Sequence, residues 1–446
     1  MTAPLSSRGN RKSFFAAAAC ACTIIYLFFG LPSKVGLETE VPAQHGFETP
    51  VTEPRPLCRD LPGANDTLVV MKTGSGEIQD KLPIHIATTL KCYPHYVIFS
   101  DASEQFQAET VIDVLEDVDQ HYKDTHEDFE LYRRLRGKGR DALEPSELSS
   151  YVSPHEEGTN GKPANPGWKL DKWKFLPMMR KTLELHPDKQ WYVFIETDTF
   201  IFWKTTLAYM AALDWTKPYY LGAQIMIGDV SFGHGGSGVL VSRPALELVV
   251  KHYVEHKHEW EEFTRNHWAG DCVLGKAFKD AGVPLTGAWP IMQGDPIGNM
   301  NYGHGQHLWC QPTVSYHHLT PSIIDEVWKF EQAWLLGAGK ADSAFFRHKD
   351  VFAEYILPRV VHPRKDWDNH CKDDRGPVSS LDQCRAVCEA DATCLQYALS
   401  ADGHCFTTSR PNLGDASKEM EAGWLFDRMQ MFYDREESCV DEGWLS

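Results

Sequence analysis

The feature that most constrains the fold is a run of five apolar residues at 191–195 (WYVFI), followed directly by Glu196, Thr197 and Asp198. A strand that is apolar on both faces has to be covered on both sides, as in the central parallel strands of α/β proteins. Ligands of such sheets bind beyond the carboxyl ends of the strands. The run therefore predicts a sheet between two layers of helices, with two carboxylates at the edge where a site is expected.

Short β-branched runs alternate with segments of helical periodicity along much of the chain. The expected strands are 67–71, 95–99, 191–195, 218–224 and 238–242, and the expected helices are 78–90, 170–185 and 245–256. Residues 137–167 are polar and rich in Gly and Pro, which is typical of a surface loop. Strands that alternate with helices favour an α/β sandwich.

Residues 14–31 form an uncharged, apolar stretch with Arg8, Arg11 and Lys12 just before it. This length and this basic flank predict a transmembrane signal anchor, with residues 1–13 cytoplasmic and the remainder translocated. A cleaved signal peptide is the alternative. Residues 32–65 are then a stem, and the protein is expected in the Golgi or another membrane of the secretory pathway as a type II protein.

Cysteine usage agrees with an oxidising compartment, because ten of the 12 cysteines lie beyond the apolar stretch. Six of them fall after residue 367, which predicts a small disulfide-stapled module over 367–446. Their spacing leaves the pairing open, since six cysteines allow 15 connectivities. The Asn65-Asp66-Thr67 sequon predicts a glycan on Asn65. The net charge of −18 argues against a nucleic-acid partner.

Glu196 and Asp198 are the first candidate ligands for a metal ion. Residues two apart on an extended segment project in the same direction, and paired carboxylates suit a hard divalent ion such as Mn²⁺ or Mg²⁺. The alternative is that the pair only caps the strand or the next helix. His317 follows a strand-like run at 314–316 and can complete such a coordination sphere.

Two further segments are candidates for the same site. The glycine-rich stretch 233–238 lets the backbone approach a ligand closely, although a tight turn explains it as well. Asp271 precedes an apolar helical run, where it is either a general base or an N-cap. His252, His256 and His258 suggest zinc only weakly, because no Glu or Cys pattern completes a site and a solvated helix face explains them.

Taken in order, these segments resemble glycosyltransferase family 31, close to the core 1 β1,3-galactosyltransferases and the fringe enzymes. The resemblance covers about residues 66–335. The matching segments are VMKTG at 70–74, WK at 173–174, WYVFIETDTF at 191–200, GGSG at 235–238 with VS at 241–242, GD at 270–271 with Gly275, and VSYH at 314–317.

The family implies a GT-A fold over residues 66–366, with a mixed sheet between helices, and a UDP-sugar donor, Mn²⁺ (or Mg²⁺) and inversion. By this resemblance Asp198 and His317 bind the metal, Glu196 takes the first acidic position, and Asp271 is the general base. Two departures stand out: Glu-Thr-Asp replaces Asp-Asp-Asp, and Gly270 replaces the acid before the base. Contacts to nucleotide or substrate are expected from Lys72, Thr73, Asp101, Lys174, Thr197, Gly235, Gly236 and Trp268.

The C-terminal segment resembles a PAN/apple module, a small disulfide-rich α+β domain. That resemblance implies the bridges Cys384–Cys405 and Cys388–Cys394, and we assign Cys371–Cys439 to the ends of the module. Apple modules bind protein or carbohydrate, so the module is expected either to recognise the acceptor or to serve as a folded cap.

The expected function is inverting, metal-dependent transfer of a hexose from a UDP-sugar to a glycan hydroxyl. The hexose is galactose, N-acetylglucosamine or glucose, and the linkage is β1,3, most like an N-acetylgalactosaminide β1,3-galactosyltransferase. The expected partners are a glycan or glycoprotein acceptor, the membrane through the N-terminal helix, and a second copy in a homodimer. The alternative is a non-catalytic membrane protein that binds glycan or protein on a decayed transferase scaffold.

Overall fold

The computed structural model describes residues 56–149, 165–302, 306–337, 345–435, 439 and 444. The chain divides into two units, 1–53 and 54–446, and the described helices and strands belong to the second. None of the helices in the described ranges is long and apolar enough to span a bilayer. The expected fold class, which included an N-terminal transmembrane helix, is therefore corrected to a mixed α/β fold with disulfides, and residues 14–31 lie outside the described residues.

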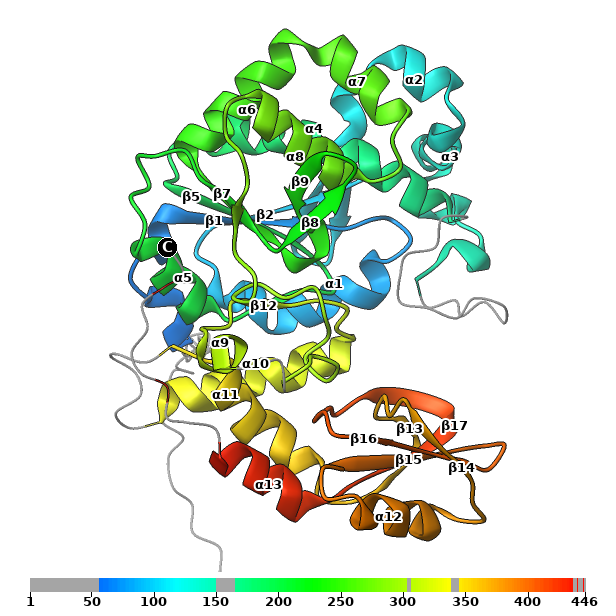
Figure 1. Ribbon diagram of the computed structural model, residues 1–446. Helices are drawn as coiled ribbons and strands as arrows, with labels where there is room; N and C mark the ends of the chain where they lie inside the picture. The colour runs from blue at the N-terminus through cyan, green and yellow to red at the C-terminus, as the bar shows by residue number, and fades with distance from the viewer. Residues whose placement is uncertain are drawn as a thin grey trace, which may run out of the picture. The chain divides into compact units, whose positions relative to one another are not determined.

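An eight-stranded mixed sheet, in the order β11-β7-β10-β5-β1-β2-β4-β3, forms the larger part of this unit (Figure 1). β1, β2, β4 and β5 are parallel, whereas β10 runs antiparallel to β5 and β7, and β3 antiparallel to β4. The strands are β1 Thr67–Lys72, β2 Tyr96–Ser100, β3 Glu104–Phe106, β4 Glu109–Asp113, β5 Trp191–Glu196, β7 Tyr220–Gly222, β10 Val239–Ser242 and β11 Thr286–Gly287.

β5 lies inside the sheet between β1 and β10, and its five apolar residues are all buried. The expected strands at 67–71, 95–99 and 238–242 coincide with β1, β2 and β10 within one or two residues. The expected strand at 218–224 is instead divided between β7 and the hairpin of β8 (Gln224–Ile227) and β9 (Val230–Gly233). The reason is that Ala223 interrupts the pairing at the point where the chain leaves the main sheet.

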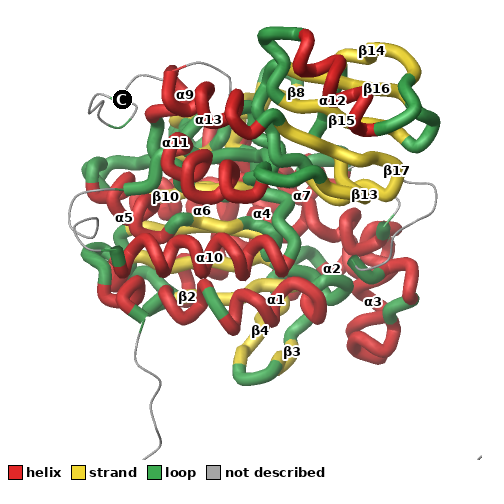
Figure 2. The backbone as a smooth tube through the Cα atoms, turned by 90° about the horizontal axis from the view of Figure 1, so that it is seen from below, coloured by secondary structure: helices red, strands yellow, loops and turns green. Residues whose placement is uncertain are grey.

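Helices cover both faces of the sheet, because the side chains of β1 point alternately into two buried clusters. Leu68 and Val70 belong to one buried cluster, and Val69 and Met71 belong to the other. Figures 1 and 2 show these two helical layers. One layer holds α2 Gln120–Thr125, α3 Glu130–Lys138, α4 Pro166–Leu185, α6 Arg243–Glu255, α7 Lys257–Arg265 and α8 Gly270–Asp280, and the other holds α1 Ile78–Ala87, α5 Trp203–Ala211 and α10 Pro321–Leu336.

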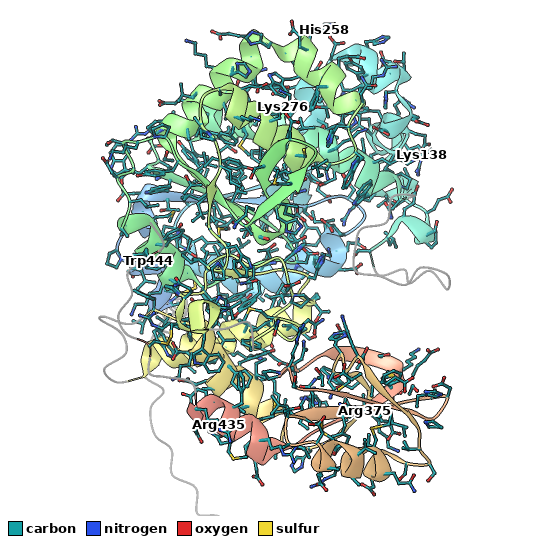
Figure 3. All side chains as sticks on the ribbon, viewed as in Figure 1. Lys138, His258, Lys276, Arg375, Arg435 and Trp444 are labelled. Carbon is teal, nitrogen blue, oxygen red and sulfur yellow. A yellow bond between two sulfur atoms is a disulfide. The ribbon has the colours of Figure 1, made fainter. Side chains whose placement is uncertain are left out.

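The C-terminal part of the unit is a five-stranded antiparallel sheet in the order β13-β17-β15-β16-β14, which packs against α12. Figure 3 marks Arg375 on β14 of this sheet. The elements are β13 Arg364–Asp368, β14 Asp373–Pro377, α12 Leu381–Ala390, β15 Gln396–Ser400, β16 His404–Thr408, β17 Asp415–Trp424 and α13 Phe426–Arg435. Whether residues 66–366 and 367–446 are separate domains, and whether the second is a PAN/apple module, stay predictions.

The disulfides differ in part from the expected set. The bridges Cys384–Cys405 and Cys388–Cys394 are present in the C-terminal sheet region. The Cys371–Cys439 bridge is wrong, because Cys439 is bonded to Cys310 and Cys371 is a buried free thiol. The predicted bridge paired two cysteines within 367–446, whereas Cys310 lies outside that segment.

The alternative pairing has a clear physical origin in the packing of α13. Phe432 on α13 packs against Trp309 on α9 (Gln306–Cys310), with ring centroids 5.6 Å apart, so α13 lies beside the helix that ends at Cys310. The bridge Cys58–Cys92 was also not predicted.

Candidate metal and acid–base site

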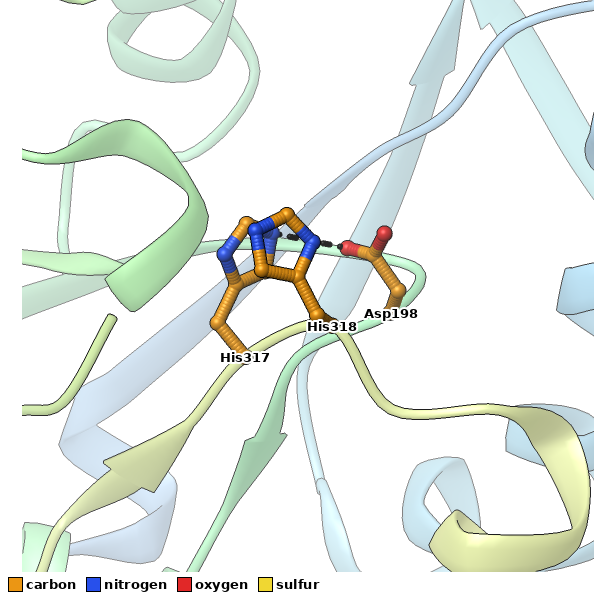
Figure 4. A group of neighbouring side chains, drawn as sticks. All are labelled: Asp198, His317 and His318. Atoms are coloured by element: carbon orange, nitrogen blue, oxygen red, sulfur yellow. Dashed lines mark ion pairs between the residues drawn. The ribbon is translucent and has the colours of Figure 1, made fainter. Parts of the chain in front are cut away.

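Two loops that follow strands bring Asp198 and His317 together. After β5 the chain turns through residues 197–199 into β6 (Phe200–Ile201), and β6 pairs with β12 (Ser315–Tyr316). His317 follows β12 directly, so its side chain reaches the acidic turn. His317 Nε2 lies 3.2 Å from Asp198 Oδ1, which Figure 4 marks with a dashed line.

His318 joins this pair, and the sequence analysis had not assigned it a role. Asp198, His317 and His318 each offer a ligand atom, and these atoms lie within 4.8 Å of one another. Burial, with the nearby charge of His317, lowers the pKa of His318 to about 4, so its imidazole is neutral at physiological pH. A neutral imidazole is the form that binds a metal.

The site's polar atoms suit a divalent cation. Asp198 Oδ1 and His317 Nδ1 are buried without a hydrogen-bond partner among the described residues. Two ligands in adjacent octahedral positions, each about 2.1 Å from an ion, lie about 3 Å apart. The observed 3.2 Å between Asp198 Oδ1 and His317 Nε2 fits that arrangement. Gly236 allows the approach, because a Cβ there would collide with the His317 ring.

Lys81 on α1 fixes the other oxygen of Asp198. Its Nζ lies 3.0 Å from Asp198 Oδ2 and 2.9 Å from Glu77 Oε2. Burial acts to raise the pKa of Asp198, but the neighbouring His317 ring and the charge of Lys81 outweigh it, so the pKa lies well below its usual value. Asp198 is therefore ionised at any physiological pH.

Glu196 faces a different partner from the one that the resemblance implied. Its Oε1 lies 2.9 Å from Lys72 Nζ, whereas its Oε2 is 3.9 Å from His317 Nε2. Burial tends to raise the pKa of Glu196, but Lys72 outweighs this and the pKa is lowered. The geometry thus pairs Glu196 with a lysine, and the group of ligand atoms within 4.8 Å of one another includes His318 but not Glu196.

The expected contact residues near β1 and β2 form an ion-pair network at the carboxyl ends of these strands. Lys72 also pairs with Asp171, and Lys174 Nζ lies 3.2 Å from Asp101 Oδ2. Lys174 also donates to Thr73 O at 2.9 Å. Both lysines are almost fully buried, so the network places two positive charges beside the acidic turn.

Asp271 lies in the first turn of α8, on the other side of the site. Its Oδ2 accepts from Gly235 N at 3.1 Å, and its Oδ1 accepts from Cys272 N at 2.9 Å. Burial raises the pKa of Asp271. The missing acid at 270 also has a steric reason, because a Cβ on Gly270 would lie 2.5 Å from the Phe175 ring.

A small cavity borders the site. Lys72, Glu196 and Gly235 are among its lining residues. The remainder of the lining is apolar apart from one glycine: Phe175, Met178, Met179, Phe194, Ile195, Gly233, Val239 and Leu274.

The other expected contact residues have varied positions. Gly236 O accepts from Thr199 Oγ1 at 2.7 Å, and Thr197 O lies 2.9 Å from His85 Nε2. Trp268 is 62% exposed, and its ring stacks on that of His267.

Sequence reasoning missed Lys81, His85 and His234, whose ring centroid is 5.3 Å from that of His317. A signal for the first two was present, because Glu77, Lys81 and His85 recur every four residues and so share one helix face.

The histidines at 252, 256 and 258 do not form a metal group in the described part of the chain. His256 and His258 are exposed, and Figure 3 shows His258 at the outer edge of the helical layer.

The chain was compared with protein-family models, curated sequences and solved structures. No protein-family model and no curated protein sequence matches this chain. One solved structure that it resembles is a glycosyltransferase involved in the glycosylation of the major capsid of PBCV-1, at 12% identity and a TM-score of 0.28. The match covers 59% of this chain and 99% of that one.

Proposed function

We propose that this protein transfers a hexose from a UDP-sugar to a hydroxyl group of a glycan, with inversion at the anomeric carbon. Asp198 and His317, with His318, hold a divalent ion, Mn²⁺ or Mg²⁺. Asp271 is the general base. As the sequence resemblance implies, the product linkage is β1,3.

The observation that carries the proposal is the pairing of Asp198 with His317 across the 3.2 Å gap. A half-buried carboxylate and a buried imidazole that follow two different strands meet at the carboxyl edge of the sheet. A divalent ion bound there would supply positive charge opposite the negative charge that develops on the departing UDP.

The base in the proposed reaction is Asp271, whose pKa burial raises. In the proposed reaction its carboxylate takes the proton of the acceptor hydroxyl while that oxygen forms a bond to the anomeric carbon. The bond from that carbon to the phosphate oxygen breaks, and its electron pair leaves with UDP. Attack on the face opposite UDP converts an α-linked donor into a β-linked product.

The lysines support the binding of a diphosphate by an acidic protein. Lys72 and Lys81 each lie between two carboxylates of the site, so their charges are held in place before a substrate arrives. The four disulfides of the described residues favour an oxidising compartment, which supports a place in the secretory pathway.

A screen of UDP-sugars with the purified protein, with UDP release as the signal, tests the proposal. We expect release that needs Mn²⁺ or Mg²⁺, that rises when a glycan acceptor is added, and that EDTA abolishes. Glycan binding that survives EDTA, with no UDP release from any donor, would instead support the non-catalytic alternative.

A further inference from the structure

The segment 293–299 reaches from the metal end of the site to the C-terminal sheet region. At its first end it runs beside β12: Gln293 N donates to Ser315 O at 3.2 Å, and His317 N donates to Asp295 O at 3.4 Å. The backbone of the proposed ligand His317 is thus attached to this segment.

At its other end the segment contacts the turn 412–415, which joins β16 to β17. Four hydrogen bonds connect this turn to Gly298 and Asn299. They are Leu413 N to Gly298 O (3.0 Å), Gly414 N to Gly298 O (2.9 Å), Asn299 Nδ2 to Asp415 Oδ2 (2.6 Å) and Asn412 Nδ2 to Asn299 O (3.2 Å).

The fit between the two turns needs glycine on both sides. A Cβ on Gly298 would lie 2.7 Å from Gly414 O, which is closer than real Cβ atoms approach a backbone oxygen. Gly414 has a φ of +82°, and a Cβ there would collide with Asp368 O. Any side chain at position 298 therefore pushes the two turns apart.

The stretch between the two contacts is too short and too ordered to absorb such a displacement. Only Pro296 and Ile297 separate Asp295 from Gly298. Asn299 N donates to Pro296 O at 2.9 Å, which closes this stretch into a turn, and the side chain of Ile297 is buried. A shift at Gly298 is thus passed to Asp295 and to the His317 amide.

We propose that the turn 412–415 is a positioning element for His317. By docking on Gly298 and Asn299 it holds the segment 293–299 against β12, so the metal end of the site is complete only while this turn is docked. The C-terminal sheet region is then part of the site's framework and not only a recognition module or a cap. The metal-binding aspect of this inference rests on the proposed function, whereas the positioning aspect does not.

Hydrogen exchange of the full chain, with and without the Gly298→Ala substitution, tests the positioning. We expect the amide of His317 and the amides of 293–302 to exchange at least tenfold faster in the variant. Gly376→Ala is the control: it adds a Cβ to a glycine of the C-terminal sheet region, at a φ of +89°, where that Cβ meets nothing within 4 Å. The control should leave exchange at His317 within twofold of the wild type.

Mn²⁺ titration of the same three proteins gives the second measurement. We expect the Kd for Mn²⁺ to rise at least tenfold in Gly298→Ala and less than twofold in Gly376→Ala. Unchanged exchange at His317 in Gly298→Ala, or equal changes in both variants, would overturn the positioning role. If the wild type binds no Mn²⁺, the proposed function fails, and the exchange data still decide whether the turn positions His317.

Discussion

The two aspartates of the candidate site have opposite electrostatic environments. Asp198 has a cationic lysine on one oxygen and an imidazole on the other, and its pKa is well below the usual value. In the described part of the chain Asp271 accepts from two backbone N–H groups, and burial raises its pKa. One residue type thus gives a permanent anion, suited to hold a cation, and a carboxylate with raised proton affinity, suited to act as a base.

Replacing Asp198 with Ala tests this comparison with the largest expected effect. The substitution removes one ligand and leaves Lys81 without its partner at the metal end, so we expect metal-dependent turnover to fall by about 10³-fold or more. UDP release measures the fall in turnover, and Mn²⁺ titration measures the loss of metal affinity. Normal turnover would contradict the role of Asp198.

Asp271→Asn should separate catalysis from binding. The amide can still accept from Gly235 N but cannot take a proton, so we expect transfer to fall by about 10²- to 10⁴-fold. Mn²⁺ and UDP binding should remain within a few fold of the wild type. If transfer persists, the base is another residue.

The pH dependence of activity distinguishes the metal ligands from the proposed base Asp271 without a mutation. The carboxylate of Asp198 raises the pKa of His317 despite its burial, so a proton competes with the metal for this ring as pH falls. Asp271 must be ionised to work, so activity is also lost as pH falls through its raised pKa.

We therefore expect higher Mn²⁺ concentrations to move the acid limb of kcat/KM to lower pH, but only as far as the pKa of Asp271. That limit should lie above the ordinary aspartate value of about 4. An acid limb that does not respond to Mn²⁺ would mean that His317 does not bind the ion.

Lys81→Met should give the smallest change. Removing an ammonium group 3.0 Å from Asp198 Oδ2 takes away a positive charge that opposes a cation, so we expect Mn²⁺ to bind a few fold more tightly. Lys329→Met is the control, because Lys329 pairs with Asp325 on the surface and should leave Mn²⁺ affinity unchanged. Weaker Mn²⁺ binding in Lys81→Met would contradict the claim that the charge of Lys81 opposes a cation bound to Asp198.

The sequence was informative where local pattern decides structure. The apolar run before Glu196 predicted a strand inside the sheet, because no amphipathic element can be apolar on both faces. It also indicated that Asp198 lies at the carboxyl edge of that sheet, where the structure has it.

The sequence was silent where distant segments decide the contact. Nothing near Glu196 indicates that Lys72 pairs with it, since only the register of β1 beside β5 brings them together. The bridge of Cys439 to Cys310 was missed for the same reason: it depends on α13 packing against α9 and not on cysteine spacing.

Anomalous scattering from a crystal soaked in Mn²⁺ tests the central claim most directly. We predict one strong peak at coordination distance, about 2.0–2.6 Å, from both Asp198 Oδ1 and His317 Nε2. A peak beside only one of these residues, or no peak between them at a saturating concentration of Mn²⁺, would contradict the account.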